Sequence, residues 1–97
     1  MAKFYFTYGS DPHFPFQDGW TEVEAPSFVL ACAAFRNFHP DRDPEILCLN
    51  CADVYTEEDF QNNTLMYFQA NYKDRCHERI TLTLTREPLD DERKDFI

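Results

Sequence analysis

The chain has 97 residues, of which 18 are acidic and 9 are basic, so its formal net charge is −9 at pH 7. Hydrophobic residues make up 43% and aromatic residues 16%, which is enough for one compact domain with a modest core and argues against global disorder. The shortage of Lys and Arg argues against direct binding to a nucleic-acid backbone. No apolar run approaches the roughly 20 residues of a membrane-spanning helix.

Two strands are expected in the first quarter of the chain. Residues 2–9 alternate and are rich in aromatic side chains, which is typical of a strand. A loop rich in Gly, Pro and Asp follows, and residues 20–25 form the second strand, with Trp20, Glu22 and Glu24 on one solvent-facing side. In the first strand, one face is expected to carry Phe4, Phe6 and Tyr8, and the other Tyr5 and Thr7.

The clearest helix is expected over residues 28–38. Ser27 is a suitable N-cap, and Pro40 ends the helix at about His39. Apolar side chains recur at helical spacing and predict an apolar stripe made of Phe28, Cys32 and Phe35, with Ala31 and Phe38 beside it.

The second half of the chain is expected to add a strand, a helix and a final strand. Residues 46–56 are mostly apolar and predict a buried strand, after which Thr56 caps a short helix whose first turn is acidic. Residues 79–87 alternate Thr with Ile and Leu and predict the last strand. This order predicts an α+β fold, with a mostly antiparallel sheet of about four strands and two helices packed on one face. We expect a single domain over residues 1–88, followed by a charged C-terminal tail over residues 89–97.

Cysteine and histidine residues predict a structural zinc site. Cys48 and Cys51 have the two-residue spacing of a zinc knuckle, and Cys76 with His77 offers a second pair of possible ligands. His39 is the natural remaining ligand. A redox role for Cys48 and Cys51 is the alternative, but thioredoxin-like motifs place the first cysteine at a helix N-terminus, whereas a strand is expected here. Simple packing of these thiols is the other alternative, and Cys32 on the helix stripe is expected to be only a small buried hydrophobe.

Three segments resemble a family of small acidic proteins encoded by phages and prophages of Gram-positive bacteria. They are "FYFTYGSDPHFPFQDGW", "CADVYTEEDF" and "CHERI", and the similarity extends from residue 4 to about residue 80. The chain is also similar in character to metal-containing anti-CRISPR proteins that inhibit type II effector nucleases. The resemblance implies a cytoplasmic, non-enzymatic inhibitor, expressed in the infected host, that binds the basic surface of a CRISPR-Cas effector and blocks DNA loading.

An acidic surface is the feature that this mechanism requires, because a nucleic-acid channel is strongly positive. The alternatives are a sponge that sequesters a nucleotide signal against Phe14, Phe16 and Trp20, a thiol enzyme, and a phage structural or regulatory protein. Direct nucleic-acid binding, membrane binding and a small-molecule ligand are not expected. The acidic residues expected to be exposed for partner binding are Glu22, Glu24, Asp41, Asp43, Glu45, Glu57, Glu58 and Asp59.

Overall fold

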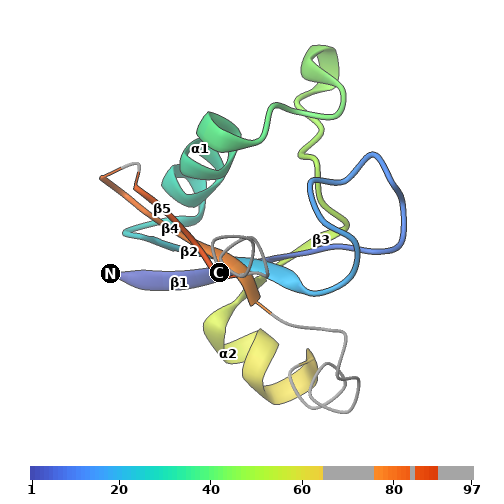
Figure 1. Ribbon diagram of the computed structural model, residues 1–97. Helices are drawn as coiled ribbons and strands as arrows, with labels where there is room; N and C mark the ends of the chain where they lie inside the picture. Colours follow the sequence, from blue (N-terminus) through green and yellow to red (C-terminus); the bar gives the residue numbers. More distant parts are fainter. Residues whose placement is uncertain (65–75, 84, 90–97) are drawn as a thin grey trace, which may run out of the picture.

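The computed structural model describes residues 1–64, 76–83 and 85–89 (Figure 1). It has the small α+β architecture expected from the sequence, built on a mixed sheet of five strands rather than about four. The sheet order is β3-β1-β2-β4-β5, in which β2 and β4 are parallel and the other neighbours are antiparallel. In chain order the elements are β1 (Ala2–Thr7), β2 (Trp20–Ala25), α1 (Phe28–Phe38), the 3-10 turn η1 (Pro44–Ile46), β3 (Asp53–Thr56), α2 (Glu57–Asp59), the π-helical turn η2 (Phe60–Thr64), β4 (Cys76–Thr81) and β5 (Arg86–Pro88).

The expectation that both helices pack on one face is wrong, because the sheet is covered on both sides. Figure 1 shows α1 on one side of the sheet and α2 on the other. On the α1 side, the ring of Phe6 stacks on Phe35 with 4.4 Å between centroids. On the α2 side, the ring of Tyr5 stacks on Phe60 at 4.3 Å, and both residues are buried. The alternation predicted for β1 is confirmed, but each of its faces meets its own apolar layer.

The first helix has the predicted bounds and caps. The Ser27 hydroxyl accepts a hydrogen bond from the Leu30 amide at 3.2 Å, and His39 is the C-cap. Phe28 of the predicted apolar stripe is less buried than expected, because half of its surface remains exposed although its ring meets the edge of Phe4. Trp20 departs in the other direction, since it is half-buried against Phe60 instead of facing solvent.

The buried strand predicted over residues 46–56 is wrong for its first half. Pro44 begins a 3-10 turn that Asp43 caps, and Leu47 then adopts a left-handed backbone with φ of 53°, which lies outside the β region. The Leu47 side chain is 68% exposed. Only β3 remains as a strand, and the predicted cap at Thr56 is confirmed by its hydrogen bond from the Asp59 amide at 3.2 Å.

The single strand predicted over residues 79–87 is also wrong, because the chain reverses direction within it. β4 begins earlier, at Cys76, and the Thr81 amide donates to the Thr85 carbonyl at 3.0 Å so that β5 can pair back on β4. The hydroxyls of Thr81, Thr83 and Thr85 bond to one another at 2.8 and 3.1 Å, which satisfies these polar groups in the reversal.

The predicted position of Leu84 and the predicted tail beyond Leu89 lie outside the described residues. No helix among the described residues is long and apolar enough to cross a membrane.

Candidate functional site

The two cysteines of the CxxC motif lie in the irregular segment before β3, and both are partly buried free thiols. Cys51 packs against the core on the α1 side of the sheet. Burial, with smaller contributions from nearby Cys32, Asp53 and Cys48, raises the pKa of the Cys51 thiol to about 12. Because the thiolate is the nucleophile in thiol exchange, this environment opposes a redox role for Cys51.

Cys76 and His77 lie at a β-bulge at the start of β4. Trp20 pairs with Cys76 and Thr21 with Glu78, so His77 is the extra residue on β4. Its buried ring stacks on Phe16 with 4.6 Å between centroids. The Nε2 atom of His77 donates to the Asp18 carbonyl at 2.7 Å. Burial, with a smaller contribution from nearby Glu22, raises the pKa of Cys76 to about 11.

The last predicted zinc ligand, His39, contacts a carboxylate instead of the cysteines. Its Nε2 atom lies 2.5 Å from Oε2 of Glu78. The ring of Phe16 contacts the imidazole rings of both His39 and His77. No group of three or more His, Cys, Asp or Glu residues within the described ranges is arranged to hold a metal ion. The zinc site therefore stays a prediction from the sequence.

Glu78 is the centre of a buried polar network that the sequence analysis missed. Its side chain is fully buried on the α1 side of the sheet. One carboxylate oxygen accepts from Thr21 at 2.8 Å and contacts His39, and the other accepts from Arg86 Nε at 2.5 Å. The hydroxyl of Tyr8 extends the network, 2.6 Å from the Thr21 hydroxyl.

The charge of Glu78 is stabilised where it lies. Burial acts to raise its pKa, but the hydrogen bond and charge of His39, with hydrogen bonds from Thr21 and Arg86, outweigh burial and hold the pKa below its ordinary value. A signal was present in the sequence, because Glu78 lies two residues before Ile80 and therefore on the same inward face of the strand. A carboxylate at such a position needs buried partners. These residues form a structural network, since the Glu78 carboxylate accepts from Thr21 and Arg86 and contacts His39.

Two of the predicted partner-binding acids are paired with arginines: Arg79 pairs with Glu22 at 3.3 Å, and Arg36 pairs with Asp41 at 2.7 Å. Asp43 and Glu45 are exposed at the 3-10 turn, and Glu24 is half-buried on β2. The other described arginines, Arg42 and Arg86, pair with Asp11 and Glu78. Every arginine in the described part of the chain is thus neutralised by a carboxylate of the same chain.

A second group of carboxylates lies along β3 and α2. Asp53 opens the strand, and Glu57, Glu58 and Asp59 form the whole of α2. Asp53, Glu58 and Asp59 are exposed and Glu57 is half-buried, and none of them forms an ion pair with another described residue. We call these four residues, Asp53, Glu57, Glu58 and Asp59, the acidic edge.

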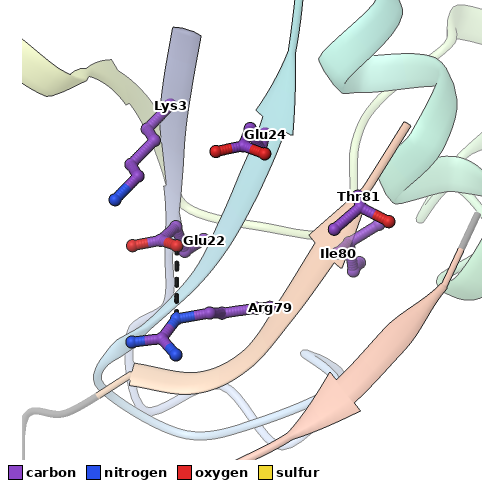
Figure 2. Close-up of a pocket in the computed structure, with 6 residues that line it drawn as sticks. All are labelled: Lys3, Glu22, Glu24, Arg79, Ile80 and Thr81. Carbon is purple, nitrogen blue, oxygen red and sulfur yellow. Dashed lines mark ion pairs between the residues drawn. The ribbon is translucent and has the colours of Figure 1, made fainter. Parts of the chain in front are cut away.

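The sheet face that carries Glu22 and Glu24 has a different charge pattern. A pocket of about 390 Å³ lies there, and Figure 2 shows Lys3 from β1 and Arg79 from β4 on either side of the two glutamates. The dashed line marks the ion pair between Arg79 and Glu22. Because the basic side chains balance the acidic ones, this face is less suited than the acidic edge to attract a basic partner.

Comparison of the chain with protein-family models, with curated proteins and with solved structures found no match.

Proposed function

We propose that the protein is a non-enzymatic, stoichiometric inhibitor of the anti-CRISPR type, which binds a basic surface of a CRISPR-Cas effector nuclease through its acidic edge. The partner surface is the Lys- and Arg-rich channel that holds nucleic-acid backbone in such effectors. A protein seated on this channel excludes DNA by occupying the same positive groups, so no bond is made or broken.

The internal pairing of the arginines is the observation that carries this proposal. Arg36, Arg42, Arg79 and Arg86 each neutralise a carboxylate of their own chain, so they do not offset the charge of the acidic edge. The carboxylates of Asp53, Glu58 and Asp59 are exposed, with Asp53 at the start of β3 and the other two in α2, which follows the end of the strand. Such a local excess of negative charge accelerates association with a positive surface and disfavours other acidic partners.

A structural zinc belongs to this proposal only as a support for the fold. If bound by Cys48 and Cys51 with Cys76, His77 or His39, it would fix the segment before β3, which positions the acidic edge. The inhibitory contact itself requires only the exposed carboxylates.

The aromatic residues of the nucleotide-sponge alternative are used within the fold. Phe14 is buried, Phe16 stacks on His77, and Trp20 packs edge-on against Phe60 at 5.1 Å between centroids. The raised pKa of Cys51 likewise gives no support to a thiol enzyme. The acidic-edge proposal is therefore the one that these contacts favour.

The test is complex formation with a purified type II effector nuclease loaded with guide RNA, measured at low and at high salt. We expect a complex that weakens steeply as salt rises and that prevents the effector from binding its DNA target. Glu58→Lys should weaken the complex by roughly tenfold at low salt, because it reverses a charge at the centre of the acidic edge.

Glu87→Lys is the matched control, since Glu87 is exposed on β5 and undergoes the same change of charge. An equal loss of affinity in both variants would mean that only net charge matters and would overturn the assignment to the acidic edge. The absence of any salt-sensitive complex would overturn the proposed function.

A further inference from the structure

The two edges of the sheet differ in their capacity to accept another strand. β3 is the terminal strand on one side and, within the described ranges, pairs only with β1 (Figure 1). An edge strand exposes a row of backbone N–H and C=O groups that a further strand can bond. At the opposite edge, β5 has only three residues and ends at Pro88, which has no N–H group to donate.

Side chains on β3 are also suited to a further strand. Val54 packs against the core on the α1 side, and Tyr55 packs against Tyr5 and Phe60 on the other side. Both residues are half-buried, so each leaves apolar surface beside the open backbone. A neighbouring strand would place its own alternating side chains over these two residues.

The charges at the two ends of β3 determine which kind of strand can pair with its outer edge. Asp53 begins the strand, and Glu57 follows directly after its last residue, Thr56. A second copy of this chain pairing edge to edge would bring carboxylates of the two copies together, which is unfavourable. An extended segment with Lys or Arg at both ends would instead place opposite charges against Asp53 and Glu57.

We propose that the outer edge of β3 receives an extended, Lys- or Arg-flanked segment of the partner protein as an additional strand of the sheet. This inference rests on the proposed function and specifies its mode of contact, in which backbone hydrogen bonds supply affinity and the end charges supply specificity. Asp53 and Glu57 are separated by about 13 Å along an extended chain, so the basic residues of the partner should lie about four positions apart.

The experiment uses the blocked peptide Lys-Val-Thr-Val-Lys and the same peptide with alternate backbone amides N-methylated. All of these peptides carry the same charge, but an N-methylated peptide cannot donate strand hydrogen bonds along one of its two edges. Because the set of methylated amides decides which edge is blocked, both alternate methylation patterns are tested. We expect the unmodified peptide to slow hydrogen exchange of backbone amides in β3 and to bind at least about tenfold more tightly than the weaker methylated form.

Variants locate the contact on the sheet. Asp53→Lys should reduce binding of the unmodified peptide severalfold, whereas Glu87→Lys at the β5 edge should leave it unchanged. Equal binding of the unmodified peptide and both methylated forms, or protection of β5 amides instead of β3 amides, would overturn the inference. A salt-sensitive effector complex would still support the proposed function in that case, so the two failures are distinguishable.

Discussion

The imidazole of His39, at the C-cap of α1, lies 2.5 Å from the carboxylate of Glu78 on β4. This contact joins the end of the helix to the centre of the sheet, and Arg86 on β5 holds the other oxygen of the same carboxylate. The end of α1 is therefore joined at one buried charge to β4 and β5, which are distant from it in sequence. The network explains why β4 contains a bulge, because the extra residue His77 lets Glu78 face Thr21 and the helix.

Replacing Glu78 with glutamine should strongly destabilise the fold. The substitution removes the buried negative charge that balances Arg86, and the amide cannot accept from all of the groups that now contact the carboxylate. Breaking a buried ion pair from one side costs about 3–5 kcal/mol. We expect a loss of this size in the free energy of unfolding, measured by urea titration.

Glu87→Gln is the control for this measurement, since Glu87 is the exposed acidic residue on the adjoining strand. Its effect should stay within about 0.5 kcal/mol, as is usual for surface substitutions. Equal and small effects of the two substitutions would contradict the buried network.

Acid should destabilise the protein through the same carboxylate. Because the pKa of Glu78 is lower in the folded state than its ordinary value of 4.5, the unfolded chain binds more protons as the pH falls below that value. The stabilisation is fully present above pH 4.5 and is lost as the pH falls toward the folded-state pKa. Urea midpoints measured from pH 7 down to pH 3 should fall more steeply for the natural protein than for Glu78→Gln. Parallel curves for the two proteins would show that another group controls the acid response.

Local signals predicted the parts of the fold that depend on few neighbours. The caps at Ser27 and Thr56 require only a hydroxyl and an amide three residues away, and both form as expected. The alternation of β1 likewise depends on its own residues. These features could be predicted because each is decided within one or two turns of chain.

Other features depend on partners that are remote in sequence. Leu47 is apolar and looked like a strand residue, but the capped turn that precedes it forces a left-handed backbone. The inward position of Glu78 requires the bulge opposite β2, and the placement of α2 on the second face requires Phe60 to reach Tyr5. Spacing in the sequence also suggested that Cys48 and Cys51 would join Cys76 and His77, whereas the ring of His77 is stacked on Phe16.

The alkylation rate of the thiols distinguishes buried, metal-free cysteines from the predicted zinc site. Since the pKa of Cys51 is raised to about 12, its alkylation by iodoacetamide near pH 8 should be at least about a hundredfold slower in the native protein than in the unfolded chain. Addition of a chelator should leave this native rate unchanged. Rapid alkylation of both Cys48 and Cys51 only after chelation, with about one equivalent of zinc found by elemental analysis, would instead confirm the zinc site.

The packing of aromatic rings on the two faces of the sheet predicts independent contributions to stability. Phe35 stacks on Phe6 on the α1 side, and Phe60 stacks on Tyr5 on the α2 side. Phe35→Leu and Phe60→Leu should each lower the free energy of unfolding by about 1–3 kcal/mol, since each loses ring contacts and leaves unfilled space. Because the ring partners described for Phe35 (Phe6, Tyr8 and His39) differ from those described for Phe60 (Tyr5, Trp20 and Tyr55), the double variant should lose the sum of the two effects to within about 0.5 kcal/mol. Phe6→Leu combined with Phe35→Leu is the matched coupled pair, and it should lose less than its sum because the first substitution already removes the stacked contact. Strong coupling between Phe35 and Phe60 would refute the placement of the two helices on opposite faces.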